Sequence, residues 1–409
     1  GLTIDLREQA HGQRYEKLLW SPEHPRLIEA EVMLAPAKAP LTGGRASTIA
    51  PASVPDVVAS YLGLRSVGAE HRRFLLNGRP YYVRAVLEQG FWPDSHLAAP
   101  DDGARRDEIA LIKRLGFNAA RIHQKVEDPR LLYWADRLGL LLWGEMASPY
   151  EFTTQSITRL VTEWSAAVRR DRSHPSIVTW VPVNESWGVQ HLAHRPEQRA
   201  LSRALADLTR AIDPSRPVVS NDGWEHTCSD IISIHDYDAD DLAVTLRYAE
   251  EDRLEALLSG LGPSGRPITV QGAVDHEAPV MVTEFGGIRY VPDGGEADGD
   301  GGAVGAAGSA GTSSTAGPGD AEETGVGDDG EDEEDETTWG YTTADGAEDF
   351  EARLRRAFGA LQASPHLAGF CYTQLTDTMQ EANGLTDAHR RPKISAKVIR
   401  EIVRTPVTS

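Results

Sequence analysis

Two glutamates, Glu185 and Glu284, stand at the ends of strongly apolar runs that cover residues 177–185 and 279–285. Removing a carboxylate from water is costly, so a buried strand rarely ends in an unpaired one without a reason. Two carboxylates that face each other across a cleft are what glycoside hydrolysis requires. One of them protonates the leaving oxygen, and the other attacks the anomeric carbon. The alternative is that both glutamates are structural ion-pair partners of residues such as Arg121.

The elements that must position these glutamates belong to a repeating pattern of segments that begins near residue 74. Apolar, strand-like runs alternate with helical segments, which is typical of a parallel sheet wrapped in helices. Eight such runs predict a (β/α)8 barrel, in which strands four and seven lie across the mouth from each other. Helices are predicted to begin at Asp128-Pro129 and to span residues 156–172. The predicted strands are 81–88, 119–123, 140–146, 177–185, 217–221, 231–237, 279–285 and 369–375.

The domain organisation is predicted from changes in composition along the chain. Residues 1–70 contain short alternating stretches such as Ile28–Leu34 and a Pro-, Ala-, Gly- and Ser-rich loop over 35–55. We interpret them as a partial immunoglobulin-like β-sandwich, because a whole one needs about 100 residues. Residues 71–409 form the predicted barrel. Its loop after the seventh strand is predicted to hold a disordered acidic insertion over 293–337, either a spacer or a binding segment.

Overall charge and composition restrict the classes of partner. The 409 residues carry a net charge of −21, which argues against nucleic acid. The predicted insertion holds 15 acidic and no basic residues, so the remainder carries only −6. No apolar run approaches the roughly 20 residues of a membrane helix. Cys228 and Cys371 are predicted to be buried thiols in a reducing cytoplasm, and the start at Gly1 suggests that the native N-terminus is missing.

Polar and aromatic residues cluster at the predicted C-terminal ends of the strands, where barrel enzymes carry their reactive groups. Period-two alternation would place Arg121, His123 and Lys125 on one side, at or above the barrel mouth. Aromatic residues there are suited to stacking on a sugar ring, although single ones serve equally well as rim packing. The predicted substrate-binding residues are Arg121, His123, Lys125, Glu145, Asn184, Trp187, Asp222, Trp224, His235, Tyr237 and Gln374.

The run from His174 to Trp180, followed by Val-Asn-Glu-Ser at 183–186, closely resembles the acid/base region of glycoside hydrolase family 2. That family includes β-galactosidases, β-glucuronidases and β-mannosidases. Residues 76–80, 115–121 and 136–140 resemble the family's entry into the barrel, its second strand and the approach to its third. Residues 19–25 and 60–65 resemble the sandwich domain that precedes the barrel.

This resemblance implies a role for each matching residue. Glu185 would be the general acid/base, and Asn184 would hold the sugar's 2-hydroxyl. Glu284 would be the nucleophile, and Arg121 beneath it would keep it ionised. Adjacent strand residues point to opposite faces, so Asn184 and Glu185 can serve one site only if the strand ends or bulges there. We therefore predict an irregular backbone at Asn184–Glu185.

The chain departs from common family patterns near the second and eighth strands, at Gln124, Lys125 and Gln374. The glutamate pair and the resemblance predict a retaining exo-glycosidase that is β-galactosidase-like, and these departures leave its sugar specificity open. The alternatives are β-glucuronidase, β-mannosidase or arabinosidase specificity, a catalytically inactive carbohydrate-binding relative, or another barrel enzyme such as a lyase or isomerase. No zinc spacing, dense ligand cluster or phosphate-cradling loop is evident, so no metal and no cofactor are predicted. The predicted partner is a carbohydrate substrate, and a homo-oligomer is possible.

Overall fold

The computed structural model describes residues 15–34, 56–270, 277–292 and 340–407. The predicted loop over 35–55 and the whole of the acidic insertion predicted for 293–337 lie outside the described residues. Within the described ranges, no helix is both long enough and apolar enough to cross a membrane.

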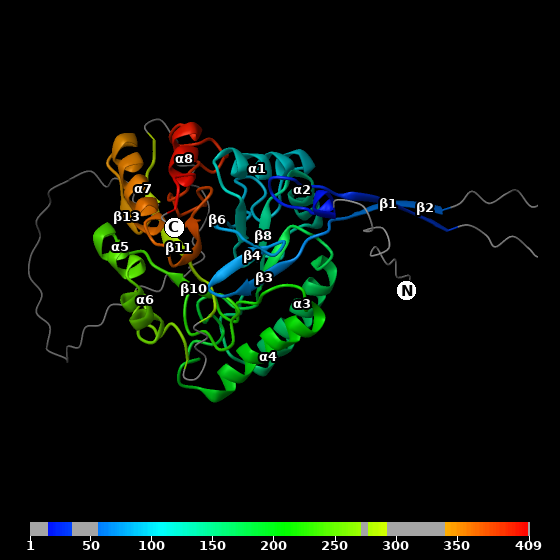
Figure 1. The fold of residues 1–409 in the computed structure, drawn as a ribbon, viewed down its shortest axis with the longest axis horizontal. Helices are drawn as coiled ribbons and strands as arrows, with labels where there is room; N and C mark the ends of the chain where they lie inside the picture. The colour runs from blue at the N-terminus through cyan, green and yellow to red at the C-terminus, as the bar shows by residue number, and fades with distance from the viewer. Residues whose placement is uncertain (1–14, 35–55, 271–276, 293–339, 408–409) are drawn as a thin grey trace, which may run out of the picture.

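A curled sheet of seven parallel strands forms the centre of the molecule (Figure 1). Its strand order is β10-β11-β14-β6-β7-β8-β9, so the first strand, β6, pairs with both β7 and the last strand, β14. This pairing of first and last strands is the closure expected of a barrel. The strands are β6 (Val83–Glu88), β7 (Ala119–Ile122), β8 (Leu141–Glu145), β9 (Ile177–Val181), β10 (Ile232–His235), β11 (Val280–Gly286) and β14 (Leu367–Thr373).

Helices alternate with these strands and cover the outside of the sheet (Figure 1). The predicted helix start at Asp128-Pro129 is confirmed, because the Asp128 side chain accepts a hydrogen bond from Arg130 N at the first turn. The predicted helix over 156–172 is also confirmed. The helices are α1 (Asp102–Arg114), α2 (Pro129–Leu138), α3 (Thr154–Asp171), α4 (Pro196–Ile212), α5 (Asp241–Ala249), α6 (Glu251–Leu258), α7 (Ala347–Gln362) and α8 (Ala396–Val403), with a short 3-10 helix η2 (Tyr15–Leu18).

The fifth predicted strand, 217–221, is not a regular strand. It forms isolated parallel bridges to the fourth strand segment, Trp180 with Val218 and Asn184 with Asp222. On its other side, Asp230 N donates to the Val218 carbonyl, and no helix separates this segment from β10. The prediction of eight regular strands was therefore wrong at this position. The segment still fills the gap between β9 and β10, which completes the barrel wall.

Alternation along the strands separates two apolar layers. Ala85 and Leu87 of β6 point inward and pack with Leu141 of β8, whereas Val86 faces the helices. Trp20 joins the inner cluster from the N-terminal segment. This segment contacts the N-terminal ends of the strands, because Pro22 lies against Gly139, just before β8. The described part of the N-terminal segment does not cover the C-terminal ends of the strands, so a functional site can form there.

The N-terminal residues form two small sheets. β1 (Ile28–Leu34) pairs antiparallel with β2 (Asp56–Leu62), and this ribbon projects from the rest of the molecule (Figure 1). β3 (Val67–Glu70), β4 (Arg73–Leu76) and β5 (Arg79–Pro80) form a three-stranded sheet, and β12 (Ile288–Arg289) pairs with β13 (Thr342–Thr343). The predicted strand Ile28–Leu34 is confirmed. Most side chains of the β1–β2 ribbon are exposed, whereas a sandwich buries one face of each sheet against the other. The immunoglobulin-like sandwich therefore stays a prediction.

The two cysteines are free. Cys371 is buried inside the barrel as predicted, whereas Cys228 is partly exposed, which corrects the prediction that both thiols are buried.

Asp136 of α2 joins the N-terminal segment to the barrel. Its fully buried carboxylate accepts hydrogen bonds from Tyr61 Oη at 2.8 Å and Ser176 N at 2.9 Å, and it lies 2.6 Å from His174 Nδ1. The Asp136 carbonyl accepts a hydrogen bond from Trp20 Nε1 at 2.8 Å. Removing the carboxylate would leave several buried donors without an acceptor, and each such donor lowers the free energy of unfolding.

We predict that Asp136→Ala lowers the free energy of unfolding by about 3 kcal/mol, because three groups lose their shared acceptor. Urea unfolding followed by tryptophan fluorescence measures the change. The control is Asp107→Ala on the exposed face of α1, where the change should stay within about 0.5 kcal/mol. Equal stability of the two variants would contradict this role for Asp136.

Candidate active site

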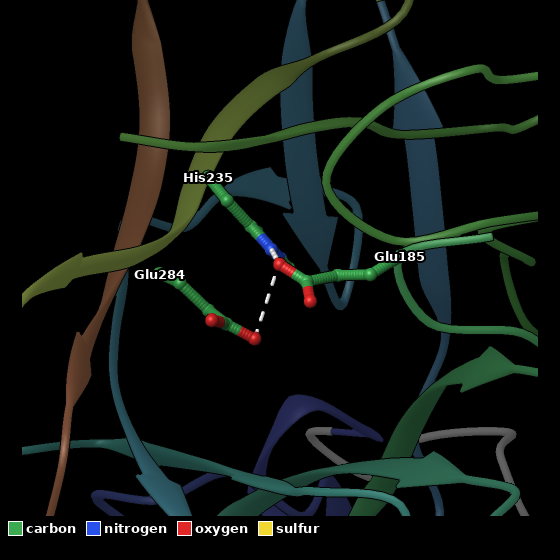
Figure 2. Close-up of side chains that lie close together, drawn as sticks. All are labelled: Glu185, His235 and Glu284. Carbon is green, nitrogen blue, oxygen red and sulfur yellow. Dashed lines mark hydrogen bonds and ion pairs between the residues drawn. The ribbon is translucent and has the colours of Figure 1, made fainter. Parts of the chain in front are cut away.

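Glu185 and Glu284 meet at the C-terminal ends of the barrel strands. Figure 2 shows their carboxyl groups approaching from opposite sides, with His235 reaching into the space between them. One carboxylate oxygen of each glutamate and one ring nitrogen of His235 all lie within 4.8 Å of one another. Glu284 belongs to β11 and is buried, whereas Glu185 follows β9 and is partly exposed.

The backbone that carries Glu185 is irregular, as predicted. β9 ends at Val181, and Glu185 and Ser186 have φ values of 50° and 57°, in the left-handed region. Glu185 N donates to the Asp222 carbonyl at 3.0 Å, which holds this turn against the fifth segment. The pleat is therefore broken, and the side chains of Asn184 and Glu185 both reach the site.

Arg121 of β7 is the centre of the site and is only 1% exposed. Its Nε lies 2.7 Å from Glu145 Oε2 and 2.8 Å from Asp222 Oδ2. Its two terminal nitrogens donate to Glu284 Oε1 at 2.8 Å and to Asn184 Oδ1 at 2.7 Å. These partners come from β8, β11, the end of the fourth strand segment and the fifth segment. One guanidinium therefore links most of the barrel mouth.

Burial alone would raise the pKa of Glu284, but the charges of His235 and Arg121 outweigh it and lower the pKa to about 2. The Tyr237 hydroxyl donates to Glu284 Oε2 at 2.6 Å and lies 3.0 Å from Thr373 Oγ1. Glu284 is therefore a carboxylate at neutral pH, with hydrogen bonds to both oxygens. Such a group is poised to act as an oriented nucleophile or ligand.

His235 links the two glutamates electrostatically. Its Nδ1 lies 2.7 Å from Glu185 Oε1, and its Nε2 lies 3.5 Å from both Glu284 Oε1 and Asp222 Oδ2. Burial alone would lower the pKa of His235, but the surrounding carboxylates, Glu284 foremost, raise it to about 10. Conversely, Arg121 and His235 hold the pKa of buried Asp222 below its usual range, although burial acts in the opposite direction.

Glu185, His235 and Glu284 are also spaced closely enough to hold a metal ion. The His235 ring, whose pKa the surrounding carboxylates raise to about 10, would have to release a proton in order to bind a metal. The expectation of no metal stays a prediction.

The remaining predicted residues lie at increasing distance from Arg121. His123 Nδ1 is 3.3 Å from both Glu145 Oε1 and an Arg121 nitrogen, so it joins the site directly. The Trp224 ring lies against His235, with centroids 5.6 Å apart. Trp187 packs edge-on against Tyr150 at 5.8 Å and makes no recorded contact with the Arg121 group in the described part of the chain.

Lys125 points away from the site, contrary to the alternation argument. β7 ends at Ile122, and Gln124 has a φ of 46°, so the period-two pattern does not continue to Lys125. The Lys125 ammonium lies 2.6 Å from Glu127 and 3.2 Å from the Gly90 carbonyl instead. We therefore leave it out of the proposed sugar-binding set.

Gln374 belongs to a polar network that sequence analysis identified only in part. Gln374 Nε2 donates to Glu381 Oε2 at 3.0 Å and to Asn383 Oδ1 at 2.7 Å. Gln89, which follows β6, donates to Gln374 Oε1 at 2.6 Å and to Glu381 Oε2 at 3.1 Å. Gln89 and Glu381 were missed because they lie in irregular loops, beyond the reach of strand alternation.

Tyr341 was also missed. Its ring stacks on Tyr237 with centroids 3.5 Å apart and an angle of 8° between the planes. It precedes β13 and follows the predicted acidic insertion, where the strand and helix rhythm gives no signal. Burial, followed by the fields of Glu284 and Glu185, raises the pKa of Tyr341. The aromatic pair therefore lies beside the nucleophile candidate.

Solved structures with a similar fold cover nearly the whole chain. A β-galacturonidase from Eisenbergiella tayi bound to galacturonate has a TM-score of 0.61 at 18% identity, covering 95% of this chain and 59% of that one. A β-glucuronidase from Bacteroides uniformis has a TM-score of 0.65 at 19% identity, covering 94% and 41%. A β-D-glucuronidase from Dictyoglomus thermophilum has a TM-score of 0.64 at 16% identity, covering 96% and 60%.

This chain thus spans 41% to 60% of the length of these proteins, and at such identities the likeness concerns the fold. A family model described as "Glycosyl hydrolases family 2, TIM barrel domain" matches residues 67–286. The match covers more than half of the 409 residues and includes both Arg121 and the two glutamates. The chain therefore belongs to glycoside hydrolase family 2, with the TIM-barrel fold of that family.

Proposed function

We propose that this chain is a retaining exo-glycosidase that hydrolyses small glycosides or oligosaccharides by double displacement. The observation that carries the proposal is the approach of Glu185 and Glu284, whose carboxylate oxygens lie within 4.8 Å of each other. Retaining enzymes hold their two carboxyl groups about 5 to 5.5 Å apart. Inverting enzymes need about 6.5 to 9.5 Å to admit a water, so the short approach favours retention.

In the first step Glu284 attacks the anomeric carbon while Glu185 protonates the glycosidic oxygen. Glu284 suits the role of nucleophile because its pKa of about 2 keeps it ionised. Asn184, held by Arg121, lies where it can bind the sugar's 2-hydroxyl. Partial exposure of Glu185 suits the group that meets the leaving aglycone.

In the second step Glu185 removes a proton from water, which attacks the glycosyl ester of Glu284. The proposed reaction requires Glu185 to carry a proton in the first step and to have lost it before the second, and esterification removes the neighbouring Glu284 charge between the two steps. The His235 ring, whose Nδ1 lies 2.7 Å from Glu185 Oε1, can hydrogen-bond to the Glu185 carboxyl group. The same side chain can therefore act first as an acid and then as a base.

A panel of nitrophenyl β-glycosides tests the proposal most directly. It should contain galactose, glucose, glucuronate, mannose and arabinose, and release of nitrophenol is measured for each. We expect hydrolysis of at least one member with retention, seen by proton NMR as first formation of the β-anomer. First formation of the α-anomer, or no hydrolysis at all, would contradict the proposal.

We predict that Glu284→Gln lowers kcat for the best glycoside by roughly 1,000-fold or more, because the amide is a poor nucleophile. The fold should persist, as measured by circular dichroism and urea unfolding. Glu348→Gln, on the exposed first turn of α7, is the matched control and should retain full activity. Undiminished turnover by Glu284→Gln would rule out its role.

We predict that Glu185→Ala slows hydrolysis of glycosides with poor leaving groups far more than that of dinitrophenyl glycosides, which need no acid. Azide, a nucleophile that needs no base, should restore turnover and yield the β-glycosyl azide. Product analysis by mass spectrometry and NMR checks this outcome. An α-azide, or rescue of Glu284→Ala rather than Glu185→Ala to the β-azide, would reverse the assignment.

We predict that His235→Asn moves the acidic limb of the kcat/KM profile to higher pH by about 1 unit, because loss of the imidazolium raises the pKa of Glu284. Tyr237→Phe removes a hydrogen bond but no cation, so it should move the limb the same way by less. Profiles from pH 2 to pH 8 measure both shifts. An unchanged limb in His235→Asn would refute this coupling.

A further inference from the structure

A third carboxylate, that of Glu381, lies near the two proposed catalytic glutamates. It is partly buried in the loop after β14, where Gln89 and Gln374 both donate to its Oε2. The field of Glu284 raises the pKa of Glu381, in addition to the larger effect of burial, and the charge of His123 lowers it. Glu381 is therefore within electrostatic reach of both the nucleophile and the mouth.

The Glu381 side chain has only amide partners among the described residues, where no ion pair includes it. Its Oε1 accepts no hydrogen bond there, so this oxygen can accept one from a ligand. Among the described residues, the cations of the site are already paired with other carboxylates. These are Arg121 with Glu145, Asp222 and Glu284, His235 with Glu185, and His123 with Glu145. Lys393, which donates to the carbonyl of the neighbouring Ala382, is paired with Asp377.

This arrangement of charges favours a ligand that donates a hydrogen bond over one that carries a negative charge. A sugar hydroxyl would donate to Glu381 Oε1 in a charge-assisted hydrogen bond. The carboxylate of a uronic acid would instead meet a like charge that is in no ion pair among the described residues, and such juxtapositions disfavour the wrong ligand strongly. The structural relatives include a protein bound to galacturonate, so the distinction between neutral and acidic sugars separates real alternatives within this fold.

We propose that Glu381 determines sugar specificity: it binds a hydroxyl of a neutral sugar and excludes uronates. This inference rests on the proposed glycosidase function and narrows its substrate class to neutral glycosides. Gln89 and Gln374 act as positioning residues, because both amides donate to Glu381 Oε2 and leave Oε1 without a hydrogen bond among the described residues.

The test compares matched pairs of nitrophenyl glycosides, β-galactoside with β-galacturonide and β-glucoside with β-glucuronide. The full chain should favour the neutral member of a pair in kcat/KM. Glu381→Gln keeps an acceptor for Gln89 and Gln374 but removes the charge, so the ratio of neutral to acidic turnover should fall by roughly 10- to 100-fold. Glu348→Gln removes one charge far along the chain and should leave the ratio unchanged.

A purely structural role for Glu381 would lower both members of a pair equally, so an unchanged ratio in Glu381→Gln overturns the inference. Preference of the unaltered chain for uronides overturns it as well. Failure of the proposed function is distinguishable, since it gives no hydrolysis of any glycoside. In that case calorimetric titration with galactose and galacturonate still decides. Neutral-sugar binding, with uronate binding gained in Glu381→Gln, supports the inference, and binding of neither sugar contradicts it.

Discussion

The structure depends on the burial of one guanidinium, that of Arg121, inside the barrel mouth. A cation that is 1% exposed is tolerable only when carboxylates surround it and satisfy its donors. Glu145, Asp222 and Glu284 provide that environment from three different segments. The charge of Arg121 in turn helps to lower the pKa values of buried Asp222 and Glu284. The ion group therefore couples the assembly of the mouth to the electrostatic state of the proposed nucleophile.

His235 adds a second cation and changes the character of the site. Three buried carboxylates around Arg121 alone would leave an excess of negative charge, and this excess raises the pKa of His235 to about 10. The resulting imidazolium lies between the two glutamates, within 2.7 Å of Glu185 and 3.5 Å of Glu284. Its charge helps to lower the pKa of Glu284. The proposed acid/base, Glu185, and the proposed nucleophile, Glu284, thus interact with the same charged ring of His235.

Family membership places the chain among proteins with the same barrel. The similar solved structures include a galacturonidase and glucuronidases. In this chain the ammonium of Lys125 is paired with Glu127, and the Glu381 carboxylate is held by amides in the loop after β14. In our proposals the Arg121 group carries the reaction, and the loops after β6 and β14 govern the choice of sugar.

The sequence by itself determined the barrel, most of its strands and the pairing of Glu185 with Glu284. Period-two alternation and apolar runs are local properties, so they can be recognised without coordinates. The irregular backbone at Asn184–Glu185 also followed from the sequence, since the family resemblance required two adjacent side chains to reach one site. Tertiary structure alone decided the irregular fifth segment and the outward turn of Lys125. It also decided the approach of Glu381 and Tyr341, because these depend on loop conformations and on contacts between residues far apart in the chain, which no local pattern encodes.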